Sequence, residues 1–226
     1  MEVLTLGTKV YKNCAFNDAA DSLRYEFRND ASNSVIILGV HYCDSNLFYN
    51  LKKTYDKVIV FNFEQLLGNE NRWVYDKNFF KWCKLADELW DYDEQNIEDV
   101  LQFIRTDVKL HILKPYKDWN SYQPVKKDID ILFYGSMNEH RRIILDKLKM
   151  KYKVVELTNV YGDALDTYIL RSKVLLNLHY YTTNLQEQAR MIRWIGAPCR
   201  IISEKSVKNY LSVEEIDYNE IGDLVI

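Results

Sequence analysis

The chain has 226 residues, of which 47% are apolar and 14% aromatic, enough to bury a sizeable core in one large or two small domains. Its formal charge of −3 divides into −4 for residues 1–114 and +1 for residues 115–226, which disfavours a protein that holds duplex nucleic acid by its phosphates. No apolar run reaches the roughly 18 residues of a membrane span, the amino terminus lacks signal-peptide features, and the four cysteines lack zinc-site spacing. We therefore expect a globular protein of the reducing cytoplasm.

The first half alternates short apolar runs with helical patterns, which is typical of a parallel sheet covered by helices. The predicted strands lie within 1–10, ending near Gly7, and at 35–40, 58–61, 89–92 and 108–113. The predicted helices lie at 18–27, 47–55, 74–86 and 96–105. Five strands alternating with helices indicate a doubly wound layer sandwich.

The pattern restarts after residues 115–127, which hold two prolines and no periodicity and are the best candidate linker. The second half has predicted strands at 129–134, 153–157, 174–178 and 200–203, and helices at 139–149 and 163–171. A further amphipathic helix is indicated by Leu185, Ala189, Ile192 and Ile195, which recur on one helical face. The fold class is therefore α/β, with Rossmann-like doubly wound domains at 1–114 and 115–226 that we expect to face each other across a cleft.

Polar side chains follow the apolar strand predicted at 174–178. Asn177, His179 and Tyr180 lie at its end, and Glu187 and Arg190 lie near the start of the next helix. Because ligands of such sheets sit beyond the carboxyl ends of the strands, we place a site here. A structural interpretation of Glu187 stays open, since it has the spacing of a capping box with Asn184 and of an ion pair with Arg190.

A second candidate is the junction between the strand at 129–134 and the following helix. Gly135 permits a tight turn, and Ser136 with Glu139 has the form of a capping box. The amides at a helix start make a natural anion site, which Arg141 and Arg142 are positioned to reinforce. The alternative is an ordinary capped helix with two solvated arginines, because the dinucleotide fingerprint and the P-loop are both missing.

Two further patterns have open interpretations. Tyr161 follows a predicted strand and is either a platform for a nucleotide base or a surface residue of a turn. The pairs Asp91 with Asp93 and Asp128 with Asp130 have D-x-D spacing, which can hold a cation on a nucleotide sugar. A capping acid explains the first pair and solvated acids at a strand start explain the second, so we expect no metal.

Histidine is the side chain best suited to proton transfer near neutral pH. His41 and His179 each follow an apolar strand, one in each half, whereas His111 lies within a strand and His140 on a helix, where both are interpreted as structural or solvated. The sequence has neither G-x-S-x-G nor H-E-x-x-H, which disfavours hydrolases.

Five motifs occur in order along the second half: G-S-x-x-x-x-R-R at 135–142, Y-G-x-x-L-D at 161–166, S-K-V-L-L-N-L-H-Y-Y at 172–181, E-x-x-R at 187–190 and C-R-I-I-S-E at 199–204. Together they resemble the nucleotide-sugar half of two-domain GT-B glycosyltransferases, in particular small bacterial, phage and large-virus members distantly akin to the "glycosyl transferases group 1" type. The runs at 87–96 and 111–116 resemble the end of the acceptor half of those proteins.

The resemblance implies that Gly135 and Ser136 approach the donor's diphosphate and that Arg141 or Arg142 neutralises it. It also implies that Glu187 binds hydroxyls of the ribose or the sugar. The residues expected near the base and the sugar phosphate are Tyr161, Gly162, Asn177, His179 and Tyr180. The sequence departs from the larger retaining enzymes in lacking E-x7-E spacing, so the stereochemistry and the donor stay open.

The predicted function is metal-independent transfer of a sugar from a nucleotide-diphosphate donor to an acceptor bound mainly by the first half. The donor-binding set also includes Arg190, and the catalytic residues are Glu187 and His41, a candidate base for the acceptor hydroxyl. No cofactor beyond the nucleotide sugar is expected, and the acceptor is a glycan, a small molecule or a protein. The alternatives are a nucleotide or nucleotide-sugar binding protein without turnover and a glycosyltransferase acting on nucleic acid; a homodimer stays open.

Overall fold

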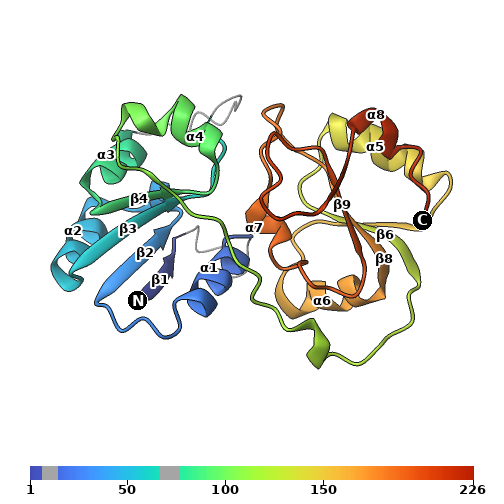
Figure 1. The fold of residues 1–226 in the computed structure, drawn as a ribbon, viewed down its shortest axis with the longest axis horizontal. Coiled ribbons are helices and arrows are strands. Elements are labelled where there is room, and N and C mark those ends of the chain that lie inside the picture. The colour runs from blue at the N-terminus through green and yellow to red at the C-terminus, as the bar shows by residue number, and fades with distance from the viewer. Residues whose placement is uncertain (7–14, 67–76) are drawn as a thin grey trace. The chain divides into compact units, whose positions relative to one another are not determined.

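The computed structural model describes residues 1–6, 15–66 and 77–226. Contacts between α-carbons divide the chain into two compact units (Figure 1). Unit 1 comprises Met1–Tyr116 with Gln188–Arg190, and unit 2 comprises Lys117–Glu187 with Met191–Ile226. Each contains one five-stranded sheet whose described strand pairs are all parallel, which confirms an α/β protein with two parallel sheets.

The sheet of unit 1 consists of β1 (Glu2–Thr5), β2 (Ser34–Leu38), β3 (Lys57–Asn62), β4 (Glu88–Asp91) and β5 (Lys109–Leu110). Its helices are α1 (Ala15–Glu26), α2 (Ser45–Thr54), α3 (Lys77–Leu85) and α4 (Glu94–Asp99), with 3-10 turns η1 (Val40–Tyr42) and η2 (Leu101–Phe103). Among these described strands the spatial order follows the chain order without reversal. Apolar periodicity locates strands but does not specify which strands pair. The predicted strand end near Gly7 and the predicted helix start at residue 74 lie outside the described residues.

The core of unit 1 is built on the central strands. Val35 and Ile37 of β2 pack with Phe48 of α2 and Trp82 of α3, and the rings of Phe48 and Trp82 stack with their centroids 4.6 Å apart. The Trp82 indole also donates a hydrogen bond to the Cys43 carbonyl at 3.0 Å, so this buried ring leaves no polar atom unsatisfied. These contacts fix α2 and α3 on the sheet.

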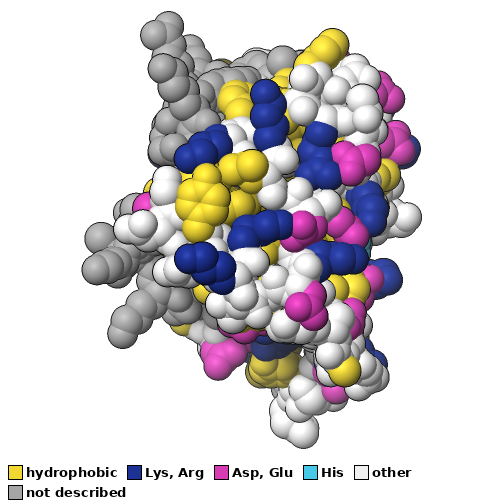
Figure 2. All heavy atoms as spheres, turned by 90° about the vertical axis from the view of Figure 1, so that its left-hand side faces the viewer, with side chains coloured by type: hydrophobic (Ala, Val, Ile, Leu, Met, Phe, Trp, Pro, Cys, Tyr) yellow, Lys and Arg dark blue, Asp and Glu magenta, His cyan; other side chains and the backbone are white. Residues whose placement is uncertain are grey.

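Lysines are concentrated on the outer side of the same two helices. Lys53, Lys81 and Lys84 are exposed there, and the Lys81 ammonium lies 4.3 Å from the centroid of the Trp82 ring. Figure 2 shows lysine and arginine side chains gathered around a hydrophobic patch on this side of unit 1. The half with the net negative charge therefore has a local concentration of lysines on the outer side of α2 and α3.

Unit 2 contains β6 (Ile129–Tyr134), β7 (Val154–Leu157), β8 (Ser172–Asn177), β9 (Arg200–Glu204) and β10 (Glu214–Ile216). In chain order its remaining elements are η3 (Trp119–Ser121), α5 (Glu139–Lys149), α6 (Gly162–Arg171), α7 (Gln188–Met191, which straddles the two units) and α8 (Tyr218–Ile221). The strand order β10-β9-β8-β6-β7 reverses at β6, which pairs with β7 on one side and β8 on the other. The doubly wound prediction is confirmed for this half.

Both faces of this sheet are covered, as Figure 1 shows for α5 and α8 on one side and α6 on the other. Alternate residues of β6 and β8 point to opposite faces of the sheet and pack into a separate hydrophobic core on each face. Phe133 and Leu176 pack with α5 and α8, whereas Leu132 and Leu175 pack with α6 and Trp194. This two-sided burial explains why both strands are continuous apolar runs.

The segment between β8 and β9 departs most from prediction. Instead of a long amphipathic helix it contains only the short α7, although Leu185 and Ile192 are buried as the periodicity indicated. Asn184 has φ 50°, whereas an N-cap residue has extended backbone, so the predicted capping box with Glu187 is wrong. Across the described residues, no helix combines the length and apolarity needed to cross a bilayer.

Candidate functional site

The reversal of strand order in unit 2 places the carboxyl ends of β6 and β8 side by side. Ligands of doubly wound sheets bind at such a reversal point. Asn138 connects the two segments that leave these strands. Its side-chain oxygen caps α5 by accepting the Arg141 amide at 3.0 Å, and its side-chain nitrogen donates to the Tyr180 carbonyl at 2.9 Å. Ser136, the predicted cap, is not the N-cap residue, because α5 begins at Glu139 and is capped by Asn138. The Ser136 side chain is exposed.

Gly135 makes the turn between β6 and α5 possible. Its φ is 145°, in the range that favours glycine, and its amide donates to the Leu157 carbonyl at 3.0 Å. The chain can therefore leave the sheet at once and begin α5 three residues after Ser136, which puts the first helical amides at the sheet's carboxyl edge.

We expect Gly135→Val to lower the free energy of unfolding of unit 2 by about 1–3 kcal/mol, because a β-branched residue is strained at this φ. Urea denaturation measures the loss. Gly222→Ala is the control: Gly222 has helical φ −62°, and an added Cβ would meet only the flexible Lys147 side chain at 3.0 Å. Equal losses for the two variants would contradict a strained turn at Gly135.

The amino-terminal turn of α5 is the best anion site at this edge. The amides of Glu139 and His140 lie in the first turn, where helix geometry offers them no intrahelical acceptor. The helix has 11 residues, and its dipole adds partial positive charge at this end.

The two arginines of α5 have different surroundings, although the sequence presents them as equivalents. Arg141 is fully buried, and its guanidinium donates to the carbonyls of Leu178 at 2.7 Å and Ser136 at 2.5 Å. Arg142 is half-exposed, with its Nη1 3.4 Å from a carboxylate oxygen of Glu156. Arg141 thus ties α5 to the end of β8, and Arg142 is the arginine that solvent can reach.

Glu187 completes the arrangement around Arg141. Its carboxylate oxygens lie 3.1 and 3.3 Å from Nη2 of Arg141, and one of them accepts the Tyr180 amide at 3.3 Å. The Tyr180 ring lies 5.1 Å from the Arg141 guanidinium and is partly exposed. The structure therefore brings together three predicted donor-site residues that are up to 46 positions apart in the sequence.

A second cluster lies at the carboxyl end of β9. Glu204 is buried, accepts the His179 amide at 2.8 Å, and has both carboxylate oxygens 2.9 Å from Nε2 of His140. His179 is 1% exposed, and its Nε2 lies 3.4 Å from the Ser206 hydroxyl. Its Nδ1 has no hydrogen-bond partner among the described residues. The predicted proton-transfer residue His179 is therefore a buried neighbour of a glutamate that the sequence did not single out.

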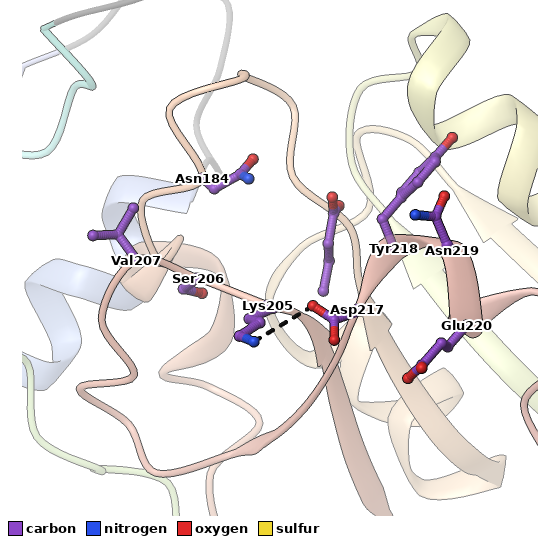
Figure 3. Close-up of a pocket in the computed structure, with 9 residues that line it drawn as sticks. Asn184, Lys205, Ser206, Val207, Asp217, Tyr218, Asn219 and Glu220 are labelled. Carbon is purple, nitrogen blue, oxygen red and sulfur yellow. Dashed lines mark ion pairs between the residues drawn. The ribbon is translucent and has the colours of Figure 1, made fainter.

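A pocket of about 700 Å³ opens next to this cluster (Figure 3). Glu204 and Ser206 line it from the end of β9, and Tyr218 lines it from the start of α8. The Tyr218 ring stacks on His140 with centroids 4.1 Å apart, so one lining residue contacts the first turn of α5. The sequence predicts a structural or solvated His140 and assigns no role to Glu204 or Tyr218. The available signal for Glu204 was its place at the end of the C-R-I-I-S-E motif, which contains β9.

The other predicted donor-site residues of unit 2 are more dispersed. Asn177 is buried and donates to the Ser203 hydroxyl at 3.0 Å, bridging β8 and β9. Tyr161 is half-buried and occupies the N-cap position of α6 without a capping hydrogen bond from its side chain, and Gly162 follows it with φ 62° and open space where a Cβ would stand. Tyr161 and Gly162 thus lie after β7, the neighbour of β6 on its far side from β8.

Two predicted site residues belong to unit 1. Arg190 lies in α7 beside Gln188, whose side chain donates to the Tyr92 carbonyl at 2.8 Å. His41 lies in η1 with its ring centroid 4.1 Å from that of Tyr42, and burial lowers the pKa of His41 to about 4. This imidazole is neutral at pH 7 and is a weak base.

The D-x-D pair of unit 1 has an internal structural role. Asp91 is fully buried and accepts hydrogen bonds from the Asn62 side chain at 2.7 Å and the Asp93 amide at 2.9 Å. Burial raises the pKa of Asp91 to about 8. Within residues 1–6, 15–66 and 77–226, no group of three or more His, Cys, Asp or Glu side chains is arranged to hold a metal ion.

No protein-family model matches the sequence. Uncharacterized protein L138 of Acanthamoeba polyphaga mimivirus is 31% identical over 198 residues, which is 81% of this chain and 21% of that protein. Uncharacterized protein L140 of the same virus is 26% identical over 223 residues, 91% of this chain and 68% of that protein. The chain thus spans about a fifth of the length of the first relative. A solved structure, the Glycosylation Associate Protein (Gap123) complex from Streptococcus agalactiae, aligns over 90% of this chain and 49% of that chain, with a TM-score of 0.47 and 9% identity.

Proposed function

We propose that the protein is a glycosyltransferase in which unit 2 binds a nucleotide-diphosphate sugar and unit 1 binds the acceptor. One observation carries the proposal: the strand order of unit 2 reverses at β6, and the glycine turn and the amino end of α5 lie at that reversal. A capped helix start at a reversal point suits a diphosphate. Three of the five motifs, at 135–142, 172–181 and 187–190, lie on β8 or on the segments that follow β6 and β8, whereas the motif at 161–166 follows β7 and the motif at 199–204 contains β9.

The proposed chemistry requires that charge on the departing diphosphate be stabilised. The first amides of α5 and the exposed Arg142 supply partial and full positive charge without a metal. Arg141 acts as a positioning residue, because its guanidinium is committed to the Leu178 carbonyl and to Glu187. Glu187, beside Arg141 and the Tyr180 amide, is our candidate for binding hydroxyls of the ribose or the sugar.

The acceptor hydroxyl needs a base, and His41 is our candidate. The proposal requires that the two units face each other across a cleft, with His41 on the acceptor side. A pKa of about 4 makes His41 a weak base. This observation favours a second candidate function, a nucleotide-sugar binding protein without turnover.

Calorimetric titration of the full chain with uridine and guanosine diphosphate sugars tests donor binding. We expect Ser136→Asp to weaken binding by about tenfold or more, because it adds a carboxylate beside the proposed diphosphate. The control is Met150→Asp, which adds the same charge at the exposed opposite end of α5. That end is farther away than the screening length in physiological salt, so its effect should be small.

Equal affinities of the two aspartate variants would contradict the assignment of α5 as the diphosphate site, and the absence of binding by every donor would contradict the proposed function. Donor hydrolysis or transfer above background by the pure protein would exclude the second candidate. A donor that binds without either reaction would favour it.

A further inference from the structure

The pocket beside β9 differs in charge from the amino end of α5. Three carboxylates line it, Glu204, Asp217 and Glu220, against one lysine, Lys205. Lys205 forms an ion pair with Asp217 at 3.5 Å, the dashed contact in Figure 3. Glu204 is held by His140 on both carboxylate oxygens. The lining therefore carries net negative charge, which disfavours a phosphate inside the pocket.

Glu220 is the carboxylate that the fold leaves available. It is exposed, and within the part of the chain that the structure describes it forms no ion pair. Glu220 can therefore contact a cation in the pocket without first breaking an ion pair within the protein.

The rest of the lining suits hydroxyl groups. The side chains of Asn184, Ser206 and Asn219 offer both donors and acceptors, and Val207 and Tyr218 add apolar surface. Figure 3 shows these side chains on the turn at Asn184, on the segment after β9 and on α8. A volume of about 700 Å³ is ample for one hexose unit.

We propose that this pocket is a sugar subsite that accepts a neutral or amine-bearing hexose unit and rejects a sugar carrying a carboxylate or a phosphate. The inference rests on the proposed function, because the lining residue Tyr218 stacks on His140 in the first turn of α5, where the diphosphate is placed. A donor would then present its diphosphate to the helix and its sugar to the pocket. A sugar unit of the acceptor has the same chemistry and is the second source.

Titration of the full chain with methyl glycosides, followed by amide NMR, tests the inference without a nucleotide. We expect the glucosaminide to bind up to about fivefold more tightly than the glucoside, and the glucuronide up to about fivefold more weakly, as a single exposed charge contact allows. The perturbed amides should lie in residues 204–207 and 217–220. Glu220→Gln should reduce the preference for the glucosaminide over the glucoside.

Asp223→Asn is the matched control. It removes the same charge from the same carboxyl-terminal segment, but Asp223 is highly exposed and pairs with Lys151 outside the lining. The inference is overturned if the glucuronide binds as tightly as the glucosaminide, if Glu220→Gln keeps the full preference, or if no glycoside binds at millimolar concentration.

Titration with uridine and guanosine diphosphates keeps this inference separate from the proposed function. If the nucleotides bind but the glycosides do not follow the expected order of affinity, only the proposed sugar subsite is contradicted. If the glycosides follow the expected order of affinity but no nucleotide binds, the sugar subsite is supported and the proposed donor site on α5 is contradicted. Competition between a nucleotide sugar and the glycoside would assign the subsite to the donor, and simultaneous binding would assign it to the acceptor; both support a sugar subsite.

Discussion

Replacing Arg141 by methionine is expected to lower the free energy of unfolding of unit 2 by about 3–5 kcal/mol, the cost of removing one partner of a buried ion pair. The Arg141 side chain is 1% exposed and the Glu187 side chain 12%. Methionine fills much of the volume but donates no hydrogen bond, so the Leu178 carbonyl loses its donor and the Glu187 carboxylate loses its charge partner.

Arg142→Met is the matched control, because it makes the same change one residue along the same helix. Arg142 is 47% exposed and its contact with Glu156 is 3.4 Å, so the expected loss is at most about 1 kcal/mol. Hydrogen exchange of the β6 and β8 amides, together with urea denaturation, measures both variants. Similar losses for Arg141→Met and Arg142→Met would show that the buried pair does not stabilise the unit.

The Arg141–Glu187 pair shows which features of the site the sequence could predict and which it could not. The strand Ile129–Tyr134 and the helix Glu139–Lys149 have the bounds expected from an apolar run, a glycine turn and a helical stripe. Those signals are local. Which arginine of the helix faces inward depends on the carbonyl of Leu178 and on Glu187, both about 40 residues away, and no spacing within the helix reports it.

The prediction of a long helix after β8 was wrong for a related reason. Its apolar stripe was real, and Leu185 and Ile192 are buried. However, Glu187 forms hydrogen bonds with Arg141 and the Tyr180 amide, and Asn184 has φ 50° where a helix cap needs extended backbone. Tertiary contacts therefore overrode a periodicity that was sufficient to identify the core but not the secondary structure.

The strand orders show the same limit at the level of the sheet. Both halves present apolar runs followed by polar residues, yet only unit 2 reverses its order among the described strands. Glu204 ends a motif that the sequence displays, but its role depends on His140 and His179, which approach it from other elements. A single sequence places residues at strand ends but does not say which strand ends are neighbours.

Asp166→Asn is expected to lower the free energy of unfolding of unit 2 by about 3–5 kcal/mol. The Asp166 side chain is 2% exposed and accepts hydrogen bonds from Arg193 at 2.7 and 2.9 Å. Lys117 lies 2.6 Å away, and the Tyr122 hydroxyl donates at 3.0 Å. Asparagine would leave two cations facing each other across a neutral side chain, with an amide group where only acceptors are tolerated.

Asp163→Asn tests whether the burial of the charge, and not its proximity to the cations, accounts for the loss. Asp163 lies 3.9 Å from Lys117 and 3.7 Å from Arg193, but its side chain is 98% exposed. Solvent screens such contacts, so we expect a change within about 0.5 kcal/mol by urea denaturation. Comparable losses for Asp163→Asn and Asp166→Asn would contradict the proposed role of burial.

The pH dependence of the same comparison gives an independent check on Asp166. Burial alone would raise the pKa of this carboxyl, but the hydrogen bonds from Arg193 and Lys117 outweigh burial and hold the pKa below its ordinary value. A carboxylate with a depressed folded-state pKa stabilises the fold above its unfolded-state pKa of about 3.9, and the contribution is lost as the pH falls through the folded-state value. The stability gap between the native chain and Asp166→Asn should therefore be constant from neutral pH down to about pH 5 and shrink only in stronger acid. A gap that closed near neutral pH would mean that Asp166 is protonated in the folded protein, and that the cluster is not held together by its charge.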